Sequence, residues 1–274
     1  MEKIFRLLLL FSLNIILMTI SISAQTNNYK TLYSDDELLI KEIDSDTYLV
    51  IHTFPWPANS LVIKFNKNNF LFIDTPYTDE ATEKLVKWLQ KRTLGKIKIT
   101  AINTHFHVDN LGGNGYLKKI GSVTYGSDLT ARLLKQRGLG NGMLQSFKDI
   151  QSDKYYTYYQ SKELVPPGKL FPISKEFKLF FEKDTIEVWY PGAAHTPDNI
   201  VVYYSRKQIL FGGCMLKSME SNSKGFLGDA DTAAWGNSLE KLLNRFPEAK
   251  LVIPGHGNLG GLDLIKHTIE IVTK

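Results

Sequence analysis

The chain has 274 residues, of which 43% are hydrophobic and 22% are charged. This length fits one large domain or two small ones, and the composition is that of a globular protein with enough apolar side chains for a core. The formal net charge is +5, and the lysines are scattered without forming a basic stripe. We therefore expect no nucleic-acid partner, whereas a mildly positive surface would suit an anionic small substrate.

The N-terminus has the pattern of a targeting segment. Lys3 and Arg6 are followed by an apolar run, Leu7–Ile20, and then by small residues that suit cleavage before Gln25. Residues 1–24 are therefore predicted to be a signal peptide. The apolar run is short for a membrane span, so an uncleaved anchor is the less favoured alternative.

Removal of this segment would leave residues 25–274 as a single mature domain, with no later stretch of transmembrane length. We expect no membrane association after cleavage, and export predicts a periplasmic location, which is oxidising. The chain nevertheless has a single cysteine, Cys214, so no intrachain disulfide can form. A lone thiol in an oxidising compartment is a liability, and binding to a metal would protect it.

The two halves of the chain repeat one order of predicted elements. In the first half, apolar patterns predict strands at Thr47–His52, Ser60–Phe65 and Asn69–Ile73, an amphipathic helix at Asp79–Arg92 and a strand at Ile97–Asn103. In the second half they predict strands at Lys178–Phe181, Thr185–Trp189, Ile200–Tyr204 and Gln208–Phe211, a helix at Thr232–Arg245, a strand at Leu251–Ile253 and a final helix from near Leu262. Two such halves favour two packed sheets with helices outside.

The segment 138–168 has no pattern that assigns it to a helix or a strand. It contains four tyrosines, Tyr155, Tyr156, Tyr158 and Tyr159. We expect partly buried packing or a loop here, and a platform for a ligand is the less favoured alternative.

The sharpest motif is an H-x-H-x-D pattern directly after a predicted strand, formed by His105, His107 and Asp109. Two histidines at positions i and i+2 of an extended chain project to the same side. Both imidazoles can then reach one metal ion, while the aspartate reaches an adjacent one. The motif is short enough to occur by chance, so further ligands are needed to support it.

Three further polar residues follow strands in the second half. His195 lies in a turn, Cys214 follows two glycines, and His256 lies between two glycines, which permit tight turns and close backbone approach. Singly, each could be an ordinary hydrogen-bonded loop residue. The other two histidines, His52 and His267, have no partner motif, and we interpret both as structural.

The combination of imidazole, thiolate and carboxylate ligands suits zinc. Six ligands divide into two tetrahedral sites, each completed by solvent. A solvent molecule shared between two zinc ions has its pKa lowered to about 7 or below, which makes hydroxide available at neutral pH.

These residues resemble the ligand set of the metallo-β-lactamase family. The six matching residues are His105, His107, Asp109, His195, Cys214 and His256. The cysteine is similar to that of the two-zinc first subclass of class B, whereas the monozinc subclass has asparagine in place of His105. Related hydrolases such as glyoxalase II, lactonases and tRNA-processing nucleases usually carry a histidine directly after the aspartate, where this chain has Asn110.

The resemblance implies an α+β fold, the αββα sandwich of two mixed sheets, with the site at one edge. It implies that His105, His107 and His195 bind one zinc ion and that Asp109, Cys214 and His256 bind the second. It further implies hydrolysis of β-lactam antibiotics by a metal-bound hydroxide, conferring resistance, with Asp109 holding the hydroxide. A monomer is the default for the family. Asp74 matches a family position near the ligand loop, either orienting a ligand or forming a turn.

Four residues are predicted to bind substrate by the same resemblance. Lys217 lies where the family has a lysine that grips the substrate carboxylate, which suits an ammonium group. Phe54 and Trp56 lie on a short turn that resembles the family's flap over the apolar part of the substrate. Phe226 replaces an asparagine that is frequent in the family, which puts stabilisation of the carbonyl by that loop in doubt.

Two other functions remain as alternatives. The first is a different hydrolase of the same superfamily, acting on a lactone or a thioester. The second is a periplasmic zinc-storage or zinc-sensing protein, which would have no use for Lys217 or for the aromatic turn.

Overall fold

The computed structural model describes residues 29–93, 95–140 and 142–274. The predicted signal peptide, residues 1–24, lies outside the described residues. Within these ranges, no helix is long and apolar enough to cross a membrane.

The described strands form two sheets, and both sheets are mixed. The first has the order β1 (Lys30–Ser34), β2 (Leu38–Asp44), β3 (Thr47–His52), β4 (Ala58–Lys64), β5 (Asn69–Ile73), β6 (Lys98–Ile102), β7 (Val123–Ser127) and β8 (Lys169–Phe171). The second has the order β13 (Leu251–Pro254), β12 (Ile209–Gly213), β11 (Val201–Tyr204), β10 (Asp184–Trp189) and β9 (Phe177–Phe181). In the first sheet β5 to β8 are parallel neighbours, and in the second β12 and β13 are parallel.

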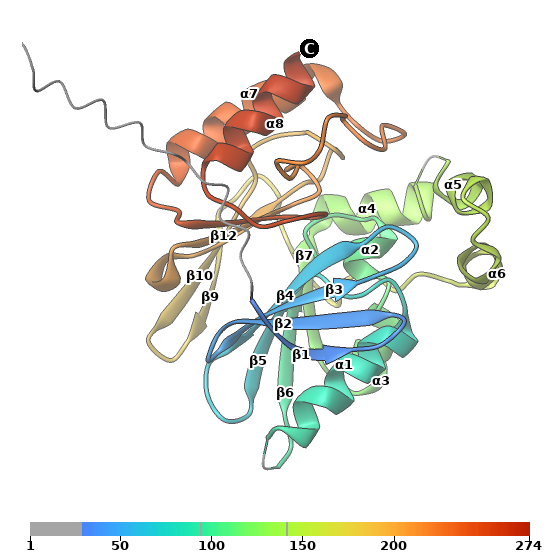
Figure 1. Cartoon of the computed structure of the whole chain (residues 1–274), viewed down its shortest axis with the longest axis vertical. Helices are drawn as coiled ribbons and strands as arrows, with labels where there is room; N and C mark the ends of the chain where they lie inside the picture. The colour runs from blue at the N-terminus through green and yellow to red at the C-terminus, as the bar shows by residue number, and fades with distance from the viewer. Residues whose placement is uncertain (1–28, 94, 141) are drawn as a thin grey trace, which may run out of the picture.

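Helices cover the outer faces of both sheets, as Figure 1 shows at opposite ends of the molecule. The first sheet is covered by α1 (Asp79–Lys91) and α3 (Asn114–Lys119), and the second by α7 (Thr232–Arg245) and α8 (Asp263–Thr273). The other α-helices of the described residues are α2 (Val108–Leu111), α4 (Asp128–Arg137), α5 (Met143–Asp149) and α6 (Asp153–Ser161). A 3₁₀ turn, Ser205–Lys207, joins β11 to β12.

Strand periodicity explains why both faces of each sheet are apolar. Successive strand residues point to opposite faces, so a strand covered on both sides must be apolar throughout. In β11, Val202 and Tyr204 face the core between the sheets, whereas Val201 and Tyr203 pack under α7 and α8. Full burial of one such aliphatic or aromatic side chain contributes about 1.5–3 kcal/mol, so each sheet is held from both sides.

The predicted α+β sandwich of two mixed sheets with outer helices is confirmed. The predicted strands and helices are all present and differ only at their ends. The sequence patterns did not predict β1, β2, β7, β8 or the helices α2 to α6. The loop alternative for the tyrosine segment is wrong, because Tyr155 and Tyr159 lie one turn apart on α6 and are both buried. The predicted packing role is confirmed.

His52 is buried at the end of β3 and joins that strand to α6. Its Nδ1 accepts a hydrogen bond from the Tyr77 backbone N–H (3.1 Å), so the proton of the neutral ring is on Nε2, 2.6 Å from the Tyr155 hydroxyl oxygen. Burial lowers the pKa of His52 to about 4. The ring contacts none of the predicted metal ligands, as its interpretation as structural requires.

The depressed pKa of His52 predicts a loss of stability in acid. The unfolded chain binds a proton near pH 6.5 and the folded chain only near pH 4. The free energy of unfolding therefore falls as the pH drops from 6.5 to 4, by up to about 3 kcal/mol from this residue. His52→Gln keeps an N–H group near Tyr155 but does not titrate, so urea unfolding should depend less steeply on pH in that interval.

Tyr155→Phe is the control, because it removes the hydrogen bond between Tyr155 and His52 but keeps the titrating ring. It should lower stability without flattening the pH dependence. Equal pH slopes for His52→Gln and the unsubstituted protein would show that His52 does not titrate as proposed.

Candidate metal centre

Three of the predicted ligands lie between β6 and α2. The chain leaves the sheet at Ile102, presents His105 and His107 in the connection, and enters α2 with His107 at the N-cap and Asp109 in the first turn. His105 and His107 are fully buried, and Asp109 is 7% exposed. A short connection between two fixed elements thus sets the positions of all three side chains.

Cys214 and His256 come from neighbouring parallel strands of the second sheet. Cys214 directly follows β12, and His256 follows β13, so both lie at the same edge. The backbones approach closely here, because a Cβ atom at Gly255 would lie 2.4 Å from Cys214 Sγ. Glycine is therefore required at position 255.

His195 completes the set from the loop that follows β10. This loop is tied to the first sheet by a hydrogen bond from the Ile200 backbone N–H to the Thr104 carbonyl (2.9 Å). Because Thr104 directly precedes His105, the bond fixes His195 and His105 relative to each other across the two sheets.

The donor atoms gather in two adjacent groups. Those of His105, His107 and His195 lie within 4.8 Å of one another, as do those of His105, Asp109 and Cys214. His195 Nε2 is 3.3 Å from His107 Nδ1. Cys214 Sγ is 3.2 Å from Asp109 Oδ2 and 3.5 Å from His256 Nε2, which is itself 3.2 Å from Asp109 Oδ2.

These separations fit a metal centre. Ligand atoms at about 2.0–2.3 Å from a tetrahedral zinc ion lie roughly 3.3–3.8 Å from one another, close to the four distances observed. The structure thus brings together all six residues that the sequence predicts as ligands, three around one point and three around the next.

Hydrogen bonds fix the tautomers of two of these histidines. His256 Nδ1 lies 2.8 Å from the carbonyl oxygen of Pro57, which can only accept, so Nδ1 carries the proton and Nε2 is free to bind a metal. His107 Nε2 lies 3.0 Å from the Asp229 carboxylate, which leaves Nδ1 as the ligand atom. Such outer partners orient ligands and raise their basicity.

The pKa values favour neutral imidazoles beside an ionised carboxylate. Burial, followed by the charge of His107, lowers the pKa of His105 to about 3, and burial lowers the pKa of His195. Burial raises the pKa of Asp109, but the adjacent His256 imidazole and the imidazoles of His105 and His107 outweigh it and hold that pKa well below its usual range. Metal ligands must be deprotonated, so these three residues are ready to bind.

A buried polar network supports the connection between β6 and α2, which carries His105 and His107. The Asp74 carboxylate accepts hydrogen bonds of 2.7 Å from the backbone N–H and the hydroxyl of Thr104. Asn110 Nδ2 lies 2.9 Å from Asp109 Oδ1 and 3.1 Å from His105 Nε2. Asp74 thus holds Thr104, the residue directly before His105, and its φ of 61° also places it in a turn.

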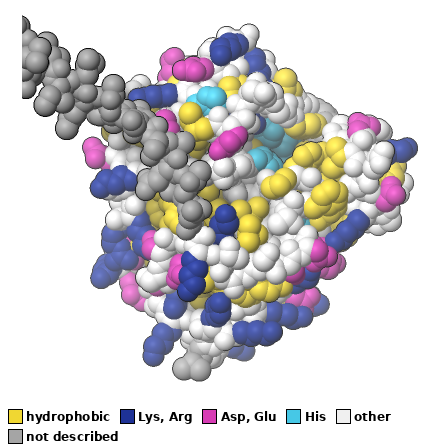
Figure 2. Space-filling model, viewed as in Figure 1, with side chains coloured by type: hydrophobic (Ala, Val, Ile, Leu, Met, Phe, Trp, Pro, Cys, Tyr) yellow, Lys and Arg dark blue, Asp and Glu magenta, His cyan; other side chains and the backbone are white. Residues whose placement is uncertain are grey.

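A cavity of about 570 Å³ opens above the ligands. Figure 2 shows histidine side chains in a hollow whose rim carries hydrophobic side chains. Three of the four residues predicted to bind substrate, Trp56, Lys217 and Phe226, line this cavity, and the Phe226 ring centroid lies 5.6 Å from that of His107. Phe54 was also predicted to bind substrate, but it does not line the cavity. Its ring is exposed and packs near Tyr155.

Lys217 is buried, although its side chain borders the cavity. Its Nζ lies 5.2 Å from the Trp235 ring centroid and 3.5 Å from the Cys214 carbonyl oxygen. Burial lowers its pKa, and the negative charges of Cys214 and Asp109 oppose that shift. An anionic group bound in the cavity would therefore stabilise the buried ammonium group of Lys217 electrostatically.

Comparison with known proteins identifies the family. The sequence model described as the metallo-beta-lactamase superfamily matches residues 53–256. The chain belongs to this family. A metallo-beta-lactamase type 2 from Bacteroides fragilis is 31% identical over 251 residues, covering 89% of each chain. One from Pseudomonas aeruginosa is 37% identical over 216 residues, covering 79% of this chain and 74% of that protein.

The same family is found among solved structures. A metallo-beta-lactamase from Pontibacter korlensis superposes with a TM-score of 0.70 at 28% identity, covering 86% of this chain and 99% of that one. The αββα fold and a metal-binding role for the clustered side chains follow from family membership together with the donor geometry.

Several residues at the site were not predicted from the sequence. Asp229 orients His107 and also accepts a hydrogen bond from Arg137 (2.8 Å), and Tyr77, Met143 and Ser146 line the cavity. None of them lies in a ligand-spacing motif. Only the helical register of α5 could have indicated Met143 and Ser146, three residues apart on one face.

We predict that Asp229 tunes metal affinity through His107. Asp229→Ala removes the acceptor that fixes the His107 tautomer, so zinc affinity measured by competition with a chelator should fall by about 10–100-fold. Asp229→Asn keeps an acceptor oxygen and should lose less. Asp36→Ala is the control, because Asp36 is exposed and belongs neither to the donor groups nor to the cavity lining. Unchanged affinity in Asp229→Ala would remove Asp229 from the metal centre.

Proposed function

We propose that the chain is a secreted, zinc-dependent β-lactamase of the two-zinc, cysteine-bearing subclass, which hydrolyses the β-lactam amide bond and thereby confers resistance. The observation that carries the proposal is a double set of metal donors on the floor of a cavity that Lys217 also borders. Relatives named metallo-beta-lactamase type 2 across most of the chain support the same substrate class.

Six residues would hold two zinc ions. We assign His105, His107 and His195 to one ion and Asp109, Cys214 and His256 to the other, as the short distances within each set support. The ions supply Lewis acidity toward the lactam carbonyl and hydroxide at neutral pH.

The chain's own residues bind and orient the substrate. The Lys217 ammonium group pairs with the carboxylate beside the lactam ring and so aligns the ring over the ligands. Trp56 and Phe226 border the cavity with aromatic surface, which packs against apolar substituents and keeps bulk water from the reacting bond. Phe226 has no donor for the lactam carbonyl, so that loop contributes packing in place of a hydrogen bond.

Asp109 is the residue we propose as catalytic. Its low pKa keeps the carboxylate ionised, and Asn110 Nδ2 holds Oδ1 in place. An ionised carboxylate at this position can accept a hydrogen bond from the attacking water and so orient it toward the lactam carbonyl.

We further propose a periplasmic, monomeric protein whose mature part, residues 25–274, is one domain. The basic and apolar N-terminal pattern and the small residues before Gln25 support export. The core shared by the two sheets supports a single folding unit.

The test is hydrolysis of three β-lactams, nitrocefin, a second cephalosporin and imipenem, by the purified protein with and without dipicolinate. We expect ring opening with all three, its loss on chelation with verified zinc removal, and its return on addition of zinc. Activity that survives complete zinc removal would contradict the metal mechanism. Faster hydrolysis of a simple lactone or thioester than of any β-lactam would indicate a different hydrolase.

A further inference from the structure

Two sets of side chains of different character form the wall of the cavity. Lys217 is accompanied by polar side chains of the following segment, Ser218, Glu220, Ser221 and Ser223. Met143 and Ser146 of α5 form another part of the wall, together with Trp56 and Tyr77. A substrate whose carboxylate pairs with Lys217 shares the cavity with α5, so another of its substituents can contact that helix.

The wall formed by α5 is continuous with the aromatic turn. The Phe147 ring, on the same helix, lies 5.3 Å from the Trp56 ring and is fully buried. Met143, Phe147 and Trp56 belong to one apolar cluster, which also includes Phe226. The Tyr77 hydroxyl donates to the Trp56 carbonyl oxygen (3.1 Å), so the turn is held from two sides.

Stacked rings connect α5 to α6. Phe147 stacks on Tyr159 at 5.3 Å between centroids, and its centroid lies 5.9 Å from that of Tyr155. The Tyr155 hydroxyl bonds to His52 at the end of β3, and the Tyr159 hydroxyl donates to the Tyr77 carbonyl oxygen. The short helix α5 thus packs against α6, which is itself hydrogen-bonded to β3 of the first sheet.

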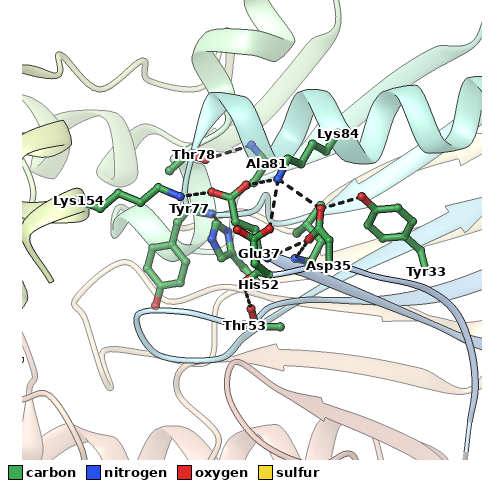
Figure 3. Close-up of polar contacts among 12 residues, drawn as sticks. Tyr33, Asp35, Glu37, His52, Thr53, Tyr77, Thr78, Ala81, Lys84 and Lys154 are labelled. Carbon is green, nitrogen blue, oxygen red and sulfur yellow. Dashed lines mark hydrogen bonds and ion pairs between the residues drawn. The ribbon is translucent and has the colours of Figure 1, made fainter.

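Ion pairs at both ends anchor α6. Near its start, Lys154 pairs with Glu37, which is 7% exposed and also accepts from Lys84 of α1 (2.6 Å), as Figure 3 shows. Just past its end, Lys162 pairs with Asp79 at the start of α1. Two anchors to the α1 region hold α6, and through it α5, at a fixed distance from the metal ligands.

We propose that α5 is the specificity-determining wall of this enzyme, and that Met143 and Ser146 select substrates by the size of the substituent that contacts this helix. The inference rests on the proposed function and adds the part of the fold that discriminates between β-lactams. Met143 is unbranched and polarisable, so it can adapt to bulky apolar groups. Penicillins and cephalosporins with a large acylamino group would contact it, whereas the small hydroxyethyl group of carbapenems would not reach it.

The experiment compares kcat/KM for a cephalosporin with a large aromatic acylamino group and for imipenem. Met143→Ala removes apolar contact and should lower kcat/KM for the cephalosporin by roughly tenfold while changing imipenem less than about threefold. Ser146→Trp fills the cavity from the same helix face and should depress the cephalosporin by at least as much. Ser146 is half-buried, so this variant keeps the test valid if Met143→Ala folds poorly.

Leu144→Ala is the matched control, because Leu144 lies on α5 beside Met143 but does not line the cavity. It should keep the ratio of the two kcat/KM values. Zinc content and thermal midpoint are measured for every variant. If the unsubstituted protein hydrolyses both substrates and neither cavity variant changes the ratio of the two kcat/KM values, α5 does not determine specificity. The proposed function would then still stand. Hydrolysis of neither substrate by the unsubstituted protein would overturn both.

Discussion

Asn59 makes the contact between the two sheets on which the metal centre depends. Its backbone N–H donates to the Gly255 carbonyl (2.8 Å), and its side-chain amide donates to the carbonyls of Pro254 and Gly257 (2.9 Å each). The three bonds hold β4 of the first sheet against the loop that carries His256. Because Asn59 is buried, loss of any of these bonds would leave unpaired polar groups out of reach of water, at a cost of about 1–3 kcal/mol each.

The same constraint explains why the ligands can be so far apart in sequence. His105 and Cys214 belong to different sheets, yet the apolar core between the sheets and the bond from Ile200 to Thr104 fix their separation. The tautomer of His256 is set by Pro57, which lies in the connection between β3 and β4 of the first sheet. A site of this kind exists only while the sheets are docked, so metal binding and docking stabilise each other.

The sequence was sufficient to predict the layered fold and the residues that the fold gathers as candidate metal ligands, because both follow local rules. Strand periodicity marks strands such as Thr47–His52, and ligand spacing marks His105, His107 and Asp109. The pattern could not reveal α5, whose cavity-lining side chains Met143 and Ser146 carry no signature of their own. Phe54 was predicted to contact substrate because sequence shows a turn but not the direction in which each ring of the turn points.

Asp229 is a polar residue whose role could likewise not be predicted from the sequence. Nothing in its sequence neighbourhood relates it to His107, and only the folded chain brings the two within 3.0 Å. The backbone of Gly140 also passes so close that a Cβ atom there would lie 2.6 Å from the Asp229 carboxylate. Gly140, in the connection from α4 to α5, therefore packs against Asp229, the hydrogen-bond partner of His107. The helix that directly follows this connection, α5, lines the cavity.

Diffraction at the zinc absorption edge, from crystals of the zinc-loaded protein, tests the central claim most directly. Two anomalous peaks are expected, one among His105, His107 and His195 and one among Asp109, Cys214 and His256. A single peak shared by His105, Asp109 and Cys214, whose donor atoms also lie within 4.8 Å of one another, would contradict the two-metal account.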